Sequence, residues 1–257
     1  MRIFVLGAGH MGAWLVEELC LDHEVAVYDL DRRKLKYFFN VRRLLEPGEA
    51  EEFKPELLIN AVGLPDVRKA FDDVLPYLAE DCILSDIASV KTGLYECYKN
   101  LGKKFVSTHP MFGPTFANIR DLRNENAIII KESDEEGKEF FRNFYKGLKL
   151  SIYEYTFEEH DKTIAYSLSI PFVSSMVFAA CMKKQEAPGT TFRRHLDIVK
   201  GLLSEDDHLL AEIVFNPHTV KQIENINSRL AYLTHIIRGR DYEEMQKFLN
   251  KLRNNIE

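Results

Sequence analysis

Short apolar runs alternate with longer amphipathic stretches over the first 155 residues of the chain. The runs have the length of β-strands, and the stretches between them carry apolar residues at helical spacing. Strands that alternate with helices in this way are typical of an α/β fold, a doubly wound parallel sheet with helices on both faces. The predicted strands are Arg2–Leu6, Glu24–Tyr28, Glu56–Val62, Cys82–Ser85, Phe105–Thr108, Ala127–Lys131 and Leu150–Tyr155.

From Thr156 onward the strand pattern is absent and helical periodicity takes over. We therefore expect two domains, an α/β domain over 1–155 and an all-α domain over 156–257. One predicted helix carries an apolar stripe, which consists of Val220, Ile223, Ile226, Leu230, Leu233 and Ile237. A small helical domain has little core of its own, so part of this stripe is expected to face a second copy of the chain in a homodimer.

Residues 163–182 carry no charged side chain, and this length would cross a bilayer. Pro171 and several serines make the segment less hydrophobic than a typical membrane span, and its small residues suit close helix packing. We therefore expect a buried central helix of the all-α domain rather than a membrane helix. Because Pro171 cannot donate a backbone hydrogen bond, a kink is expected near it.

The first predicted strand leads directly into a glycine-rich turn and then a helix. The turn reads Gly7-Ala8-Gly9-His10-Met11-Gly12. Gly7 permits the tight turn, Gly9 lets the backbone approach a pyrophosphate, and Gly12 lets the helix pack closely on the strand. The helix N-terminus adds unpaired N–H groups and a partial positive charge. This order predicts a dinucleotide site, the Rossmann arrangement, in which His10 contributes its backbone only.

Asp29 ends the second predicted strand and is expected to select the cofactor. A carboxylate at this point can accept both ribose hydroxyls of the adenosine half of NAD, and it would repel the 2′-phosphate of NADP. Arg32 and Arg33 follow at once, where basic side chains could embrace such a phosphate. NAD is therefore the expected cofactor, with NADP less favoured, and a glycine turn that binds nothing is the alternative without a ligand.

Composition limits the classes of function. The 257 residues are 46% hydrophobic and 29% charged, as in ordinary globular proteins. A formal net charge of -6 argues against a nucleic-acid-binding surface. The cysteines stand singly, which indicates a reducing, cytoplasmic compartment. We expect no signal peptide, because the N-terminus enters the first strand directly, and no metal site, because the histidines show no ligand spacing.

His109 is the clearest candidate for acid–base chemistry. It ends a short apolar strand and leads into the rigid loop Pro110-Met111-Phe112-Gly113-Pro114. Histidine changes its charge nearest to neutral pH, and the carboxyl ends of parallel strands are where such sheets bind ligands. A hydrogen-bonded loop histidine is the alternative without catalytic function. The segment Ser85–Lys91 lies some twenty residues upstream, after the preceding strand.

Five motifs follow one another along the chain. They are G-A-G-H-M-G at 7–12, S-D-I-A-S-V-K at 85–91, S-T-H-P-M-F-G-P at 107–114, E-H-D-K at 159–162, and Phe192-Arg193 after Pro188-Gly189. In order and spacing they resemble prephenate dehydrogenase over essentially the whole chain. The resemblance implies oxidative decarboxylation of prephenate to 4-hydroxyphenylpyruvate with NAD, in tyrosine synthesis. Because the sequence ends after the helices, a short form without chorismate mutase or regulatory modules is expected.

The resemblance also implies roles for single residues. His109 would be the base that takes the proton of the substrate's C4 hydroxyl, Ser89 would orient both, and Arg193 would grip a carboxylate through two parallel bonds. Ser169 would be a substrate ligand, at the place where many bacterial members have the first histidine of an S-H-L-P-H segment. Because serine carries no charge, recognition of the ring carboxylate would differ from theirs. His160 is expected to be structural, as a helix cap or in a surface ion pair.

Two other functions remain open. Arogenate dehydrogenase carries out the same chemistry on a side chain with an α-amino group, and the related β-hydroxyacid dehydrogenases share the glycine turn and a helical second domain. A non-enzymatic dinucleotide sensor would keep the glycines and Asp29 but would have no need of His109 and Ser89.

Overall fold

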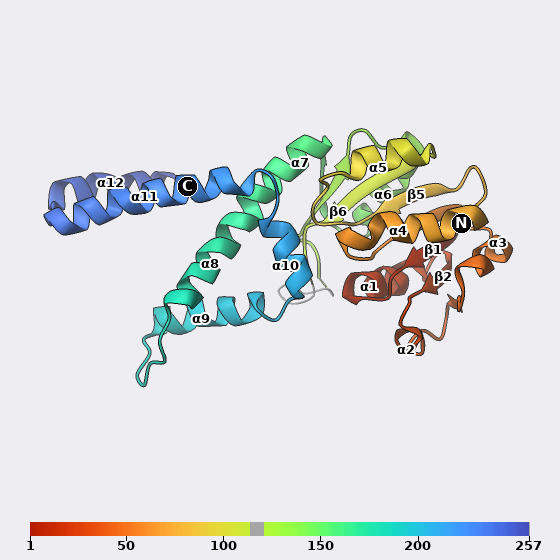
Figure 1. The fold of residues 1–257 in the computed structure, drawn as a ribbon, viewed down its shortest axis with the longest axis horizontal. Coiled ribbons are helices and arrows are strands. Elements are labelled where there is room, and N and C mark those ends of the chain that lie inside the picture. The colour runs from red at the N-terminus through yellow and green to blue at the C-terminus, as the bar shows by residue number, and fades with distance from the viewer. Residues whose placement is uncertain (114–120, 257) are drawn as a thin grey trace.

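The structure is a computed structural model that describes residues 1–113 and 121–256. A sheet with helices on both faces comes first, and a helical arm projects from it (Figure 1). Among the described residues, every element after Tyr155 is helical. The predicted fold class, a sheet-based α/β part followed by an all-α part, is confirmed.

The sheet has eight strands in the order β3-β2-β1-β4-β5-β6-β7-β8. The strands are β1 (Arg2–Leu6), β2 (Glu24–Tyr28), β3 (Arg42–Arg43), β4 (Leu57–Asn60), β5 (Ile83–Asp86), β6 (Phe105–Pro110), β7 (Asn126–Ile130) and β8 (Ser151–Tyr155). Seven of them coincide with the predicted strands. The short strand β3 consists of two arginines, which give no apolar signal.

One pair of strands departs from the predicted parallel arrangement. β7 runs antiparallel to β6, whereas the other neighbouring strands are parallel. The described part of the β6–β7 connection, residues 111–113 and 121–125, contains no helix, and the Met111 N–H donates to Asn126 O at 2.8 Å. The chain therefore folds back beside β6, as antiparallel strands can do without a crossover helix. Pro114, which ends the histidine motif, lies outside the described residues.

Helices cover both faces of the sheet. They are α1 (His10–Leu19), α2 (Arg32–Leu35), α3 (Ala50–Phe53), α4 (Leu64–Val74), α5 (Leu94–Leu101) and α6 (Glu135–Gly147). Leu15 of α1 and Phe141 of α6 pack on the face that carries Val5, and Phe71 of α4 packs on the opposite face with Leu58. All five side chains are fully buried, and burial of such a side chain contributes about 1.5–3 kcal/mol.

The helical arm begins directly after β8. Its elements are α7 (Phe157–Ile164), a π-helical turn (Ala165–Ser169), α8 (Ile170–Cys181), α9 (Thr190–Leu202), α10 (Asp207–Val214), α11 (Thr219–Gly239) and α12 (Tyr242–Asn254). The last two lie side by side and extend away from the sheet (Figure 1).

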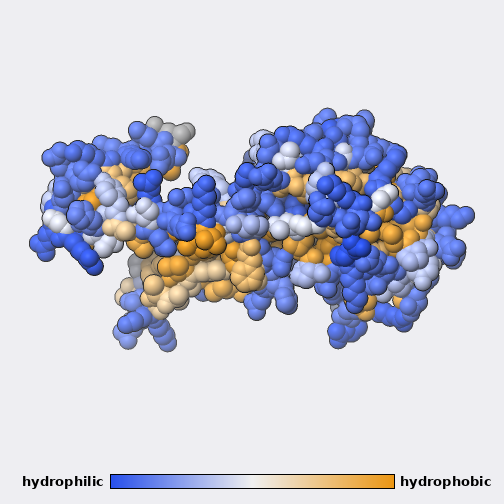
Figure 2. All heavy atoms as spheres, turned by 45° about the horizontal axis from the view of Figure 1, so that its top comes forward, coloured by the Kyte–Doolittle hydropathy of each residue, from blue (hydrophilic) through white to orange (hydrophobic). Residues whose placement is uncertain are grey.

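The apolar helix of the arm is less buried than its sequence predicts. Among the described residues, Phe157–Cys181 is the one helix that is long and apolar enough to cross a membrane. Only 17% of its apolar window is buried in this chain, and α8 contains no buried residue, so the prediction of a buried helix is wrong for the single chain. Pro171 lies in the first turn of α8, where its missing N–H is tolerated, directly after the π-helical turn. Figure 2 shows apolar side chains gathered over this part of the arm.

Candidate active site

The turn after β1 has the geometry that its glycines predict. Gly7 has a φ of +93°, and its N–H donates to Tyr28 O at 2.8 Å. A Cβ on Gly12 would lie 2.0 Å from the Gly7 carbonyl oxygen, so a larger residue cannot fit there. Gly9 is the N-cap of α1, and a Cβ on it would meet nothing within 4 Å. The N-terminus of α1 is therefore open to a pyrophosphate.

Asp29 lies at the end of β2, against this turn. Its carboxylate accepts the Ala8 N–H at 2.7 Å and the Asp31 N–H at 2.8 Å. The Lys34 ammonium lies 3.2 Å from the same carboxylate. Because two backbone donors fix the Asp29 side chain, its oxygens are held at the place where a ribose diol would bind.

The two arginines considered as ligands of a 2′-phosphate have other partners. Arg32 pairs with the Glu46 carboxylate and donates to Leu45 O at 3.2 Å. Arg33 pairs with Asp31 at 2.8 Å. The basic side chain beside Asp29 is instead Lys34, which belongs to none of the sequence motifs.

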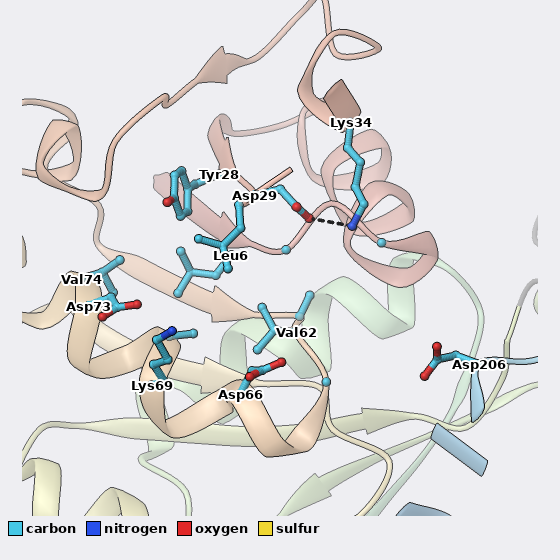
Figure 3. Close-up of a pocket in the computed structure, with 16 residues that line it drawn as sticks. Leu6, Tyr28, Asp29, Lys34, Val62, Asp66, Lys69, Asp73, Val74 and Asp206 are labelled. Carbon is cyan, nitrogen blue, oxygen red and sulfur yellow. Dashed lines mark hydrogen bonds and ion pairs between the residues drawn. The ribbon is translucent and has the colours of Figure 1, made fainter. Parts of the chain in front are cut away.

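A cavity of about 460 Å³ follows this edge of the sheet (Figure 3). Gly7, Gly9 and Asp29 line it, so the structure brings these predicted cofactor residues to one site. Leu6 and other apolar side chains form a wall of the kind that an adenine ring needs. Asp206, the N-cap of α10, lines the cavity from the helical arm.

A chain of buried hydrogen bonds begins at His109, in β6. His109 Nδ1 lies 2.9 Å from His160 Nε2, and His160 Nδ1 lies 3.0 Å from Asp161 Oδ1. The Asp161 carboxylate also accepts the Lys91 N–H at 2.8 Å and the Thr92 hydroxyl at 2.6 Å. His160 is fully buried, and His109 is 5% exposed. The chain of bonds therefore joins the end of β6 to α7 and to the loop after β5.

The acceptors in this chain determine where the ring protons lie. Burial alone would raise the pKa of Asp161, but the hydrogen bonds from His160, Thr92 and the Lys91 N–H outweigh it and lower that pKa. The ionised carboxylate can only accept, so His160 carries its proton on Nδ1 and accepts at Nε2. His109 must then donate its Nδ1 proton to His160. The lone pair of His109 is left on Nε2, where it can act as a base.

Both imidazoles are neutral near pH 7. Burial lowers the pKa of His109 well below its ordinary value, and the charge of His160, when His160 is protonated, and the charge of Lys91 act in the same direction. Burial also lowers the pKa of His160, although its bond to Asp161 opposes this effect. A neutral imidazole is the form that a general base requires.

Lys91 is a fully buried cation beside these histidines. Its ammonium pairs with the Asp86 carboxylate and donates to Thr108 O at 2.7 Å, and Asp86 also accepts the Tyr98 hydroxyl at 2.7 Å. These bonds fasten β5 to β6 next to His109. Because removal of one partner would leave an unpaired buried charge, at a cost of about 3–5 kcal/mol, Lys91 holds the site together rather than binding a substrate anion.

Ser89 follows β5, on the same sheet edge as His109, and is half-buried. Among the described residues, no hydrogen bond joins the two, and neither lines the dinucleotide cavity. Their shared position at the ends of adjacent parallel strands is what the sequence predicts.

Ser169 is committed to the interior of the helical arm. Its hydroxyl donates to Ile213 O at 3.0 Å and receives a hydrogen bond from the Thr219 hydroxyl at 2.8 Å, and its side chain is 1% exposed. It links the π-helical turn to α10 and α11. The hydroxyl that is expected to contact the substrate thus has two hydrogen-bond partners inside the arm.

Arg193 lies far along the arm. It is exposed near the start of α9, and its neighbour Phe192 contacts Phe178 close to the end of α8. From Ile164 to Phe178 the helix rises about 20 Å, at 1.5 Å per residue. Figure 1 shows α9 at the end of α8 that is remote from β6. The Arg193 of one chain therefore does not join the His109 of that chain.

The prediction for His160 as a cap or surface residue is wrong. Thr156 is the N-cap of α7, and Glu159 completes the capping box. The buried residues of the helix are Phe157, His160, Asp161 and Ile164. Spacings of three, four and seven place them on one face. In the sequence, the signal that His160 is buried was the pair of polar residues, His160 and Asp161, on an otherwise apolar helix face.

Residues 23–150 match the protein family described as "Prephenate dehydrogenase, nucleotide-binding domain". A curated relative, the "Probable arogenate/prephenate dehydrogenase" of Methanocaldococcus jannaschii, is 22% identical over 213 residues. The match covers 77% of this chain and 47% of the relative, so the chain spans about half the length of that protein.

Two solved structures are similar over nearly the whole chain. Prephenate dehydrogenase from A. aeolicus, in complex with hydroxyphenyl propionate and NAD+, is 19% identical, with a TM-score of 0.86 over 99% of this chain and 96% of that one. Arogenate dehydrogenase from Synechocystis is 18% identical, with a TM-score of 0.77 over 99% of this chain and 98% of that one. These similarities show a shared fold that includes the helical arm.

Proposed function

The chain belongs to the prephenate and arogenate dehydrogenase family, and on this premise we propose that it catalyses the NAD-dependent oxidative decarboxylation of prephenate to 4-hydroxyphenylpyruvate. The observation that carries the proposal is the neutral His109 at the end of β6, with its lone pair on Nε2. It lies on the same sheet edge as the glycine turn, where parallel sheets bind their ligands.

The residues around the glycine turn fit NAD. The open N-terminus of α1 suits the pyrophosphate, the fixed carboxylate of Asp29 suits the ribose diol, and the apolar wall at Leu6 suits the adenine. When bound, NAD supplies the acceptor for the hydride that the substrate loses.

The chemistry of prephenate requires one base. Its ring carries a hydroxyl at C4 and a carboxylate at C1. In the reaction, C4 loses a hydride, the hydroxyl loses its proton, and carbon dioxide leaves C1 as the ring becomes aromatic. His109 Nε2 takes the hydroxyl proton, a role that contributes about 10²–10⁴-fold to the rate. Ser89, at the end of the adjacent strand, holds the same hydroxyl in place.

A homodimer through the helical arm is part of the proposal. In α8, Val177 is 55% exposed, and Val220, Leu230 and Ile237 of the α11 stripe are each more than half exposed. Exposed apolar surface of this kind favours association by about 25 cal/mol per Å² that is buried. A second copy offers the same face and is self-complementary about a two-fold axis.

The dimer also explains the place of Arg193. Arg193 is exposed near the start of α9, and α9 begins at the end of α8 that is remote from β6 (Figure 1). A second copy that covers α8 would also reach this part of the arm. We assign it to the partner's site, where Arg193 of the partner subunit grips a prephenate carboxylate.

Arogenate is the alternative substrate, since one relative is named for both compounds and one similar structure for arogenate. The two substrates differ only in the keto or amino group of the side chain.

The test of the proposed function is kcat/KM for each substrate, from NADH absorbance at 340 nm. We expect the higher value with prephenate. The reverse ranking would assign the chain to arogenate, and no NADH with either would leave a dinucleotide-binding protein without this activity.

A further inference from the structure

The hydrogen bonds from His109 to Asp161 run in one direction. The Lys91 N–H and the Thr92 hydroxyl both donate to the Asp161 carboxylate, so the order of donors is His109 to His160 and His160 to Asp161. The three side chains are almost wholly enclosed. No sequence motif joins them, because His109 and His160 are separated by 51 residues and come from different parts of the fold.

The charges in this enclosed region also favour a proton on His160. The charged groups that face His160 are Lys91, Asp86 and Asp161, and those that face His109 are Lys91 and, when charged, His160. One ammonium and two carboxylates leave one net negative charge. A single imidazolium would neutralise it, and at His160 that imidazolium would lie in direct contact with Asp161.

We propose that His160 is a positioning residue for His109 that also receives a proton from it during the reaction. This inference rests on the proposed function. The substrate O–H bond breaks as the proton binds His109 Nε2, and the Nδ1–H bond of His109 breaks as that proton binds His160 Nε2. His160 keeps its Nδ1 proton on Asp161. The hydride leaves separately for the nicotinamide. After product release, the proton on His160 Nε2 returns to His109 Nδ1, and His109 Nε2 gives its proton to solvent.

Two substitutions of His160 separate positioning from proton transfer. His160→Phe removes the acceptor for His109 Nδ1 and should lower kcat at least about tenfold, because the base loses its fixed tautomer. His160→Gln offers an amide oxygen to the same Nδ1–H but cannot take a proton. It should therefore recover part, but not all, of the lost kcat. Lys162→Gln, on the exposed face of the same helix, is the matched control and should keep wild-type kcat.

Asp161→Asn tests the charge. The Lys91 N–H requires an oxygen at the Oδ1 position, so the amide oxygen should stay toward His160 and the tautomers should be kept. Only the negative charge is lost. The acid limb of the kcat/KM profile should move to lower pH by about one unit, and the plateau should fall. A side chain needed only for folding would lower thermal stability without moving this limb.

Ring ¹⁵N NMR of the free protein tests the tautomers without any assay of activity. His109 and His160 should both carry their proton on Nδ1. A proton on His109 Nε2 would overturn the inference, as would an unchanged kcat and pH profile in His160→Phe. If the predicted tautomers are found but prephenate and arogenate are both inert, the proposed function fails while the directed hydrogen bonds stand.

Discussion

The ammonium of Lys34 lies 3.2 Å from the carboxylate of Asp29 at the dinucleotide cavity (Figure 3). The Asp29 carboxylate can accept hydrogen bonds from the ribose diol of NAD, and the Lys34 ammonium beside it could bind the 2′-phosphate of NADP. Because Asp29 is held by two backbone N–H groups and Lys34 is a half-exposed flexible chain, the carboxylate is the more fixed of the two.

Cofactor preference follows from this pair. NAD should exceed NADP in kcat/KM by at least about tenfold, since the loss of one charge-assisted hydrogen bond plus repulsion exceeds roughly 1.4 kcal/mol. Lys34→Met should reduce the residual activity with NADP and leave that with NAD nearly unchanged. Steady-state kinetics with both cofactors measures this. Equal values for NAD and NADP in the wild-type protein would show that Lys34, not Asp29, decides the preference.

The buried histidines predict a dependence of stability on pH. The pKa of His109 is lowered by burial, so the unfolded chain binds a proton first as the pH falls through about 6.5. Stability is therefore present above this pH and is lost below it, by on the order of 1 kcal/mol between pH 7.5 and 5.5 for His109 alone.

Urea unfolding of wild-type and His109→Asn protein at these two pH values, at one protein concentration, measures the effect. The substitution should remove on the order of 1 kcal/mol of the difference in unfolding free energy between the two pH values. His208→Asn, at an exposed histidine, is the control and should retain the whole difference. An identical pH dependence in all three proteins would show that His109 titrates normally.

Arg193 supplies a prediction about the substrate carboxylate. Arg193→Ala should lose about 10- to 150-fold in kcat/KM, mainly through KM, because the carboxylate is present in both the ground and the transition state. Arg193→Lys should recover only part of the loss, since an ammonium lacks the planar fork. A KM for prephenate within about twofold of wild type in the alanine variant would place the substrate cation elsewhere.

Mixing two variants tests whether the site is shared between subunits. In a dimer of one His109→Asn chain and one Arg193→Ala chain, one site would hold both native residues if Arg193 acts across the interface. Unfolding and refolding of an equal mixture should then restore about a quarter of wild-type activity at low prephenate. No recovery in a mixture that is shown to contain mixed dimers would place both residues in one chain.

Much of the α/β part could be predicted because its strands are short apolar runs between helices, and period and length are local properties of the sequence. The antiparallel direction of β7 could not be predicted, because an apolar run such as Asn126–Ile130 has the same pattern in either direction. The burial of α8 was overestimated for a related reason. Its apolar composition indicates that other protein surface buries it, but does not say whether that surface belongs to the same chain or to a second copy.

In the candidate site, too, local features could be predicted from the sequence and contacts between distant elements could not. The glycine turn and Asp29 are close in sequence to the elements that position them, and the structure brings them together. The contact between His109 and His160 depends on how α7 docks against β6, which no local pattern encodes. Ser169 shows the converse, since its place in a motif suggested a ligand but its neighbours on α10 and α11 use its hydroxyl.

The most direct test of the account is the stoichiometry and rate of prephenate turnover by wild-type and His109→Asn protein. The wild-type protein should form NADH, carbon dioxide and 4-hydroxyphenylpyruvate in equal amounts. In His109→Asn the side-chain amide can still donate to His160, so the fold and the NAD affinity measured by calorimetry should be kept while kcat falls about 100-fold or more. A variant that retains more than about a third of wild-type kcat, or a wild-type protein that forms no NADH with prephenate, would contradict the account.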